Sequence, residues 1–122
     1  GFSFGDDVAS GKILANRLRY KLGGPLNKFV SAGKLAIGIC NGFQILCEAH
    51  LLPGALTRNG HLHFRNRDQV LRIESTGTAW TNSFQAGQEV LVPVKNGEGC
   101  FVADARTLDD VDRVLNSLRK KL

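Results

Sequence analysis

The sequence is poor in cysteine, and its three cysteines stand far apart with no C-x-x-C pair among them. An odd number at such spacing predicts neither a disulfide framework nor a metal site, and a reducing cytosolic compartment fits this usage best. Aromatic residues make up only 7% of the chain, and the absence of RNP and helix-turn-helix patterns argues against nucleic-acid binding. No apolar run approaches about 18 residues and no charged-then-apolar leader is present, so neither a membrane span nor a signal peptide is predicted.

What the chain does have is enough apolar sequence for one small domain over residues 1–122. At 43% hydrophobic it can bury a core, although a chain of this size has little stability to spare. The net charge of +5 comes from scattered lysines and arginines, with a concentration at residues 119–121. A basic surface suits anionic nucleotides and an acidic partner surface equally well.

Residues 34–47 place an apolar run, a glycine-flanked turn and the start of a helix in direct succession. Leu35 to Ile39 is short and apolar, as a buried parallel strand should be, and the residues after the turn suit a helix packed back on it. Cys40 falls at the junction. Gly38 and Gly42 remove side chains that would clash where strand and helix cross closely. The pattern predicts a nucleophile elbow at the carboxyl end of a central strand.

Cys40 also has a simpler interpretation, because a free cysteine is most often a small buried hydrophobe and G-x-C-x-G alone is a weak pattern. The strand before it and the helix after it are the context that the motif requires, and they favour the elbow. There the thiol points outward. The backbone N–H of Asn41 and the helix N-terminus would both favour a thiolate and an oxyanion.

The remaining elements are predicted from periodicity and turn signals. An amphipathic helix around residues 13–22 should end at Gly23-Gly24-Pro25, and a second short helical piece should follow. Later segments predict a mixed or antiparallel part of the sheet and a closing amphipathic helix: two strands within 62–74, one strand over 90–94, and a helix over 108–122.

Three blocks of sequence together resemble one family. They are GICNGFQILCEA at 38–49 followed by LLPGALTRN at 51–59, GFSFGDD at 1–7, and PVKNGEG at 93–99. Taken in their order along the chain, they are similar to the glutaminase subunit or domain of phosphoribosylformylglycinamidine synthase, a class I glutamine amidotransferase of purine biosynthesis. Two departures stand out: the first glycine of the family's G-G-F-S-[YF]-G-D loop is missing, and Asn96 stands where the family carries histidine.

The resemblance implies a partial flavodoxin-like three-layer α/β/α fold, present as a single domain that is incomplete at both ends. It also implies an enzyme that hydrolyses glutamine and supplies ammonia for the ATP-dependent conversion of formylglycinamide ribonucleotide to formylglycinamidine ribonucleotide. The partner would be a larger synthetase subunit. That subunit would hold ATP and Mg, and no cofactor is expected in this domain.

Site roles also follow from the resemblance. Without it, Gln44 would be an ordinary helix-surface amide, and residues 1–7 a polar turn capping the next helix through Asp7 or Ser10. With it, the roles are as follows: Cys40 as nucleophile, Gly1 or Phe2 together with Asn41 as oxyanion-hole N–H donors, Gln44 as a substrate-orienting side chain, and Asn96, Gly97 and Glu98 as an active-site loop.

The general base is where the chain departs most from the family. Class I members carry a catalytic histidine and its acidic partner in a late P-H-P-E-like motif, which this sequence lacks. His50, His61 and His63 match no such motif and are expected to be surface or structural residues.

Two alternatives therefore remain open beside the glutaminase. One is a catalytically incompetent fragment or remnant that acts only in binding or structure. The other is an unrelated cysteine hydrolase that uses His61 or His63 as its base. For the isolated chain we expect no turnover, and we expect self-association through exposed strand edges or exchange of the last helix.

Overall fold

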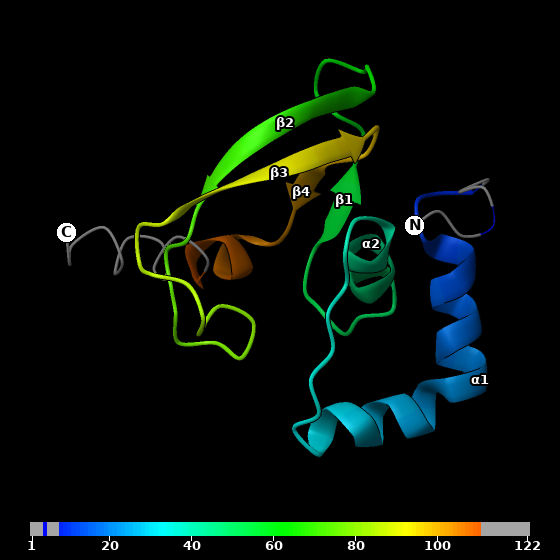
Figure 1. Ribbon diagram of the computed structural model, residues 1–122. Helices are drawn as coiled ribbons and strands as arrows, with labels where there is room; N and C mark the ends of the chain where they lie inside the picture. The colour runs from blue at the N-terminus through cyan, green and yellow to red at the C-terminus, as the bar shows by residue number, and fades with distance from the viewer. Residues whose placement is uncertain (1–3, 5–7, 111–122) are drawn as a thin grey trace.

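The computed structural model describes residue 4 and residues 8–110, and Figure 1 shows a mixed α/β arrangement over them. This confirms the predicted α/β class. The elements are α1 (Lys12–Ser31), α2 (Asn41–Glu48), β1 (Ala55–Thr57), β2 (Arg65–Arg72), β3 (Glu89–Asn96) and β4 (Cys100–Val102). Residues 105–110 are also helical, and the rest of the predicted closing helix lies outside the described residues. No helix in the described ranges combines the length and apolar character needed to cross a membrane.

Helix α1 does not stop at Gly23-Gly24-Pro25, so the prediction of two separate helices is wrong. The helix runs on to Ser31 with Pro25 inside it, and its two arms meet at a sharp bend. A proline within a helix removes one N–H donor and crowds the carbonyl four residues before it, which kinks a helix without necessarily ending it. The Gly-Gly-Pro sequence therefore acts as a bend.

The small core lies between α1 and α2. Ala15, Ile45 and Ala49 are buried there, and Leu14, Leu18 and Leu51 pack against them. The two helices come so close that a Cβ on Gly11 would lie 2.8 Å from Cγ1 of Ile45. An ion pair between Lys12 and Glu48 spans the same contact. Helix α2 is thus held against the first arm of α1.

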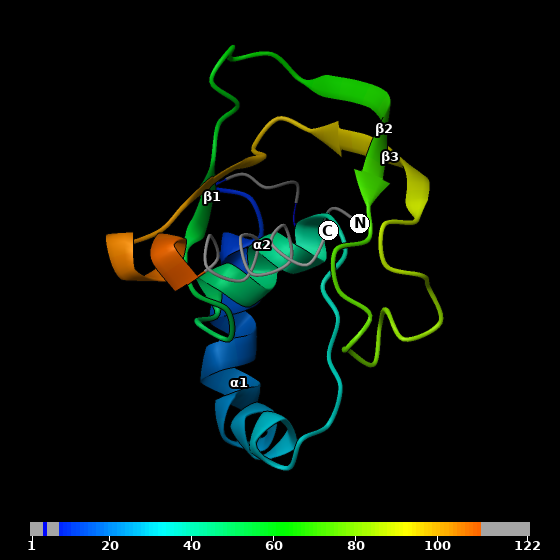
Figure 2. The same cartoon turned by 90° about the vertical axis from the view of Figure 1, so that its left-hand side faces the viewer.

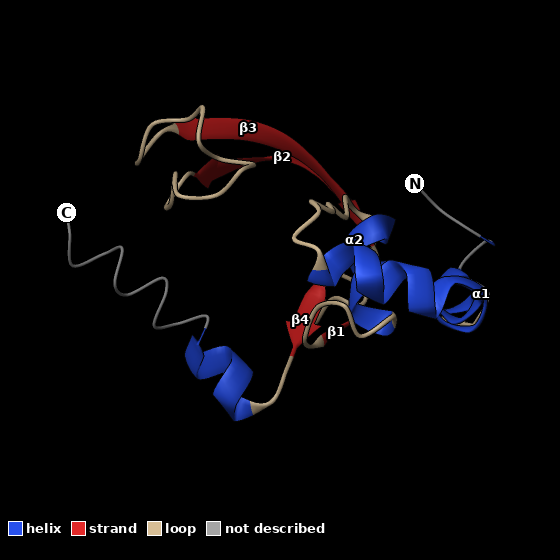
Figure 3. Cartoon of the chain, turned by 90° about the horizontal axis from the view of Figure 1, so that it is seen from below, coloured by secondary structure: helices blue, strands red, loops and turns tan. Residues whose placement is uncertain are grey.

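Both sheets are two-stranded and antiparallel, β1 with β4 and β2 with β3, as Figure 3 shows. The strand expected at 90–94 is confirmed within β3, and the antiparallel character is also as predicted. The two strands expected in 62–74 are a single strand, because the charged residues 65–69 pair with β3 instead of interrupting the ladder. Most side chains of this hairpin are exposed, which explains why charged residues are tolerated along it.

The apolar stretch Leu35 to Ile39 is not the buried central strand that the sequence predicts. Residues 34–39 link α1 to α2 without regular secondary structure, as the cyan segment of Figure 2 shows. Leu35, Ile37 and Ile39 are 59%, 56% and 71% exposed. A parallel strand requires a neighbouring ladder on at least one side, and no strand of the described residues pairs with this segment.

Candidate functional site

Cys40 occupies the junction between residues 34–39 and α2. It is the N-cap of α2, with φ 56° and ψ −117°, a backbone conformation that an L-residue adopts at a cost of about 1–3 kcal/mol. Its side chain is exposed, so the interpretation of Cys40 as a buried hydrophobe is wrong. A strained turn that presents a thiol at the start of a helix has the geometry expected of a nucleophile elbow.

The two glycines that flank the turn contribute differently. A Cβ on Gly38 would lie 2.5 Å from the Gly42 carbonyl oxygen and 2.6 Å from Cδ1 of Leu46, distances that no real side chain tolerates. The close crossing predicted at Gly38 is therefore confirmed. At Gly42 a Cβ would meet no atom of the described residues within 4 Å, so the expected need for glycine there is not borne out by their packing.

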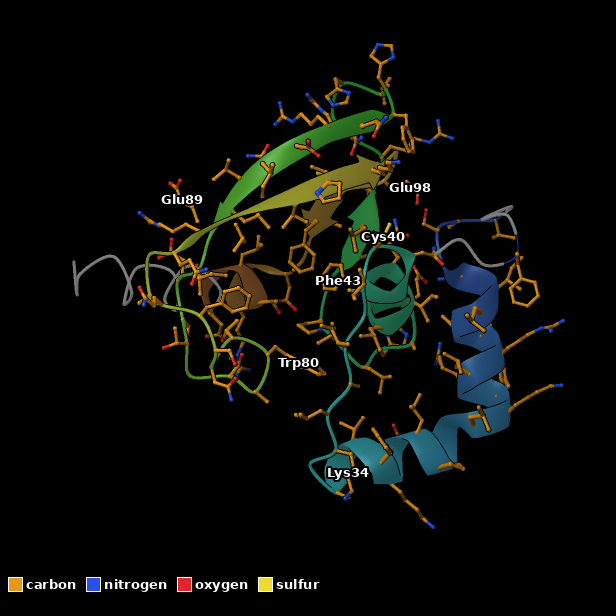
Figure 4. All side chains as sticks on the ribbon, in the orientation of Figure 1. Lys34, Cys40, Phe43, Trp80, Glu89 and Glu98 are labelled. Atoms are coloured by element: carbon orange, nitrogen blue, oxygen red, sulfur yellow. The ribbon has the colours of Figure 1, made fainter. Side chains whose placement is uncertain are left out.

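Two cavities, of about 300 and 250 Å³, open beside the elbow, and their walls share Cys40, Gln44, Lys95, Asn96 and Glu98. Sγ of Cys40 lies 3.7 Å from the backbone oxygen of Lys95. Figure 4 shows Cys40 at the end of α2, close to the end of β3 that leads to Glu98. The structure thus brings the predicted loop residues Asn96, Gly97 and Glu98 together with Cys40.

Gln44 is not a helix-surface amide. It is 9% exposed, and its Nε2 donates a hydrogen bond to the Glu98 backbone oxygen at 2.9 Å. Its Oε1 accepts a hydrogen bond from Nδ2 of Asn41 at 3.0 Å, and Asn41 is 1% exposed. The first turn of α2 is therefore joined through side-chain amides to the loop after β3.

Ser10 brings polar groups to the second cavity from the segment before α1. Ser10 lines it, and the Ser10 backbone N–H donates to Oε2 of Glu98 at 3.2 Å. Gly1 and Phe2, the predicted second oxyanion donors, lie outside the described residues. Within the part of the chain that the structure describes, no group of three or more potential ligand side chains is close enough to hold a metal ion.

None of the three histidines lines either cavity beside Cys40. All are exposed, as predicted for surface or structural residues. The rings of His61 and His63 stack with centroids 6.1 Å apart, and the His63 backbone N–H donates to Nδ1 of His61 at 3.1 Å. This arrangement gives no support to a hydrolase that uses His61 or His63 as its base.

The other two thiols line neither of these cavities. Cys47 is 2% exposed on the inner side of α2, as predicted for a core residue. Burial raises the pKa of the Cys47 thiol, and the negative charge of Glu48 raises it further, so Cys47 stays protonated and unreactive. Cys100 is exposed on β4.

Asn59 is a site-supporting residue that the sequence analysis did not single out. It is 8% exposed in the turn between β1 and β2, and its side chain bonds to the loop between β3 and β4. An asparagine in a turn-rich segment is ordinary in sequence, so the only signal for it was its position within one of the blocks that carry the family resemblance.

The sequence profile of the CobB/CobQ-like glutamine amidotransferase domain matches residues 1–116. The chain belongs to this family. Two relatives of this glutamine amidotransferase domain carry the name phosphoribosylformylglycinamidine synthase subunit PurQ. The protein of Streptomyces avermitilis is 51% identical over 109 residues, which cover 89% of this chain and 45% of the relative. The protein of Mycobacterium tuberculosis H37Rv is 48% identical over 115 residues, 92% of this chain and 49% of the relative.

A solved structure gives the same assignment for the fold. The structure of PurLQS from Thermotoga maritima superposes on 85% of this amidotransferase chain and 48% of the matched chain, with a TM-score of 0.76 and 36% identity. The chain spans about half the length of the curated relatives it matches. The family predicted from the three sequence blocks is therefore confirmed.

Proposed function

We propose that this chain provides the glutamine site of a phosphoribosylformylglycinamidine synthase, where glutamine is hydrolysed to supply ammonia for the ATP-dependent amidation of formylglycinamide ribonucleotide. The observation that carries the proposal is the exposed Cys40 thiol. It sits on a strained turn at the N-terminus of α2 and opens onto a cavity walled by the loop after β3. The names of the relatives support the choice of reaction.

In this mechanism the Cys40 thiolate attacks the side-chain amide carbon of glutamine. The tetrahedral oxyanion forms at the N-terminus of α2, where the Asn41 backbone N–H and a second N–H near Gly1 or Phe2 donate to it. The carbon–nitrogen bond then breaks, the nitrogen takes a proton and leaves as ammonia, and a γ-glutamyl thioester remains on sulfur. Water adds to the thioester, releases glutamate and returns the thiol. Gln44 orients the substrate in this scheme.

The partner in this proposal is a larger synthetase subunit of the same enzyme, which holds ATP and Mg and receives the ammonia. The similarity to PurLQS supports such a partner, because the name PurLQS joins more than one subunit. A cytoplasmic location accords with the free cysteines. Two observations favour this function over a non-catalytic remnant. The turn that presents Cys40 at the start of α2 is intact, and the sequence is 51% identical to a named synthase subunit over 89% of this chain.

Self-association of the isolated chain belongs to the same proposal. Apolar side chains are exposed along residues 34–39 and on both strands of the β2–β3 hairpin, among them Val70 at 51% and Leu91 at 67%. Surface of this kind is rarely left in water by a soluble monomer. A second copy would cover it when no synthetase subunit is present.

A chloroketone analogue of glutamine tests the site without requiring a general base. The Cys40 thiolate displaces chloride and forms a stable thioether, which peptide mass spectrometry locates. We expect saturable labelling at Cys40 that L-glutamine suppresses, and no labelling in Cys40→Ala. Cys100→Ala, which removes another exposed thiol, should label like the parent chain. Labelling of Cys40 and Cys100 at equal rates, without protection by glutamine, would show a reactive thiol with no glutamine site.

A further inference from the structure

Asn59 uses its polar atoms to hold the loop between β3 and β4. Nδ2 donates to the backbone oxygen of Asn96 at 3.0 Å, and Oδ1 accepts from the Gly99 backbone N–H at 3.0 Å. The Asn59 backbone N–H donates to the Gly97 oxygen at 3.0 Å. Asn59 is thus hydrogen-bonded to three of the four residues 96–99, namely Asn96, Gly97 and Gly99. A second bond from Nδ2, to the His63 backbone oxygen at 2.9 Å, fixes the amide from its own turn.

The loop that Asn59 holds is the wall that faces Cys40. Within residues 96–99, the Glu98 backbone oxygen accepts the hydrogen bond from Nε2 of Gln44. Oε1 of Gln44 in turn accepts from Nδ2 of Asn41, the residue that follows Cys40. Asn96 and Glu98 line both cavities beside Cys40, whereas Asn59 lines neither of them. Asn59 lies instead behind the loop, in a separate hollow that it shares with Asn96 and Gly99. It therefore acts on the site only through the backbone of this loop.

We propose that Asn59 is the positioning residue that sets the loop 96–99 against the Cys40 thiol and so determines how tightly this site holds glutamine. The inference rests on the proposed function for its ligand. Only an uncharged amide of this length both donates to two carbonyl oxygens and accepts from an N–H in this pocket. The isosteric carboxylate of aspartate keeps the acceptor for the Gly99 N–H. It has no N–H donors, however, and it places negative charge against the backbone oxygens of Asn96 and His63. In Asn59→Asp we therefore expect residues 96–99 to shift relative to Cys40. Cys40 itself, at the start of α2, should stay exposed.

The test compares Asn59→Asp with Asn82→Asp, which makes the same chemical change at an exposed asparagine outside the site. The readouts are labelling of Cys40 by the glutamine chloroketone, over a range of concentrations, and by iodoacetamide. For Asn59→Asp we expect the half-saturating chloroketone concentration to rise at least tenfold, with the iodoacetamide rate at Cys40 changed less than twofold. Amide hydrogen exchange should lose protection at the backbone N–H of residue 59, which donates to the Gly97 oxygen in the parent chain, and keep it in the second half of α2. Asn82→Asp should match the parent chain in every readout.

Several results would overturn the inference. If the parent chain shows saturable labelling and Asn59→Asp shows the same half-saturation, the loop does not depend on Asn59. If Asn59→Asp and the milder Asn59→Ser both render the buried Cys47 reactive to iodoacetamide, Asn59 is a general folding residue and not a positioning one. Failure of the parent chain to show saturable labelling rejects the glutamine site itself. In that case retained protection at the backbone N–H of residue 59 in Asn59→Asp would separately show that Asn59 does not position the loop.

Discussion

At the scale of single residues, the site depends on two amides and one glycine as much as on the thiol. Asn41 and Gln44 are buried and bonded to each other, so the first turn of α2 has one arrangement relative to the loop at Glu98. The sequence placed Cys40 at the junction correctly, because glycine spacing around a thiol is a local pattern. The burial of Gln44 was missed, because its partner is 54 residues away and no local pattern encodes that contact.

Gly38 and Gly42 give a matched pair for testing the close crossing at the elbow. Gly38→Ala forces a methyl group into the Gly42 carbonyl and the Leu46 side chain, so we expect a loss of about 1–3 kcal/mol in the free energy of unfolding. Gly42→Ala, in the first turn of α2, meets no atom of residues 4 and 8–110 and should be neutral or stabilising by up to about 1 kcal/mol. Urea unfolding followed by circular dichroism measures both. Equal destabilisation by the two substitutions would mean that the crossing is not tight at Gly38.

At the scale of elements, local sequence predicted whether a segment is helical or extended better than it predicted where each element ends and what it pairs with. Periodicity located the helical character of α1, but the consequence of Gly23-Gly24-Pro25 depended on whether the next residues continued the helix, and they did. The apolar run at 35–39 has the composition of a buried strand and yet has no ladder partner among the described residues. Pairing is a relation between distant segments, so composition alone specifies a preference and not a sheet. The charged strand β2 shows the converse, because pairing with β3 overrides its composition.

At the scale of the whole molecule, the exposed apolar surface predicts association. We expect the isolated chain to elute above the mass of one copy in size-exclusion chromatography with light scattering, and its mass to fall with dilution. Leu91→Lys, at an exposed position of β3, should shift the equilibrium toward single copies, whereas Asn82→Lys adds the same charge in the connection between β2 and β3 and should not. A folded species of one-chain mass, 13.3 kDa, at every concentration would reject self-association.

Release of ammonia from glutamine, measured with and without a synthetase subunit, tests the central claim most directly. The cavities beside Cys40 contain no imidazole, so we expect the isolated chain to release no more ammonia than the blank. With the subunit present, and imidazole added to the assay to supply the base, we expect release that Cys40→Ala abolishes and Cys100→Ala preserves. In the complex with imidazole, equal release by the parent chain and Cys40→Ala, or no release by the parent chain, would contradict a glutaminase site built on Cys40.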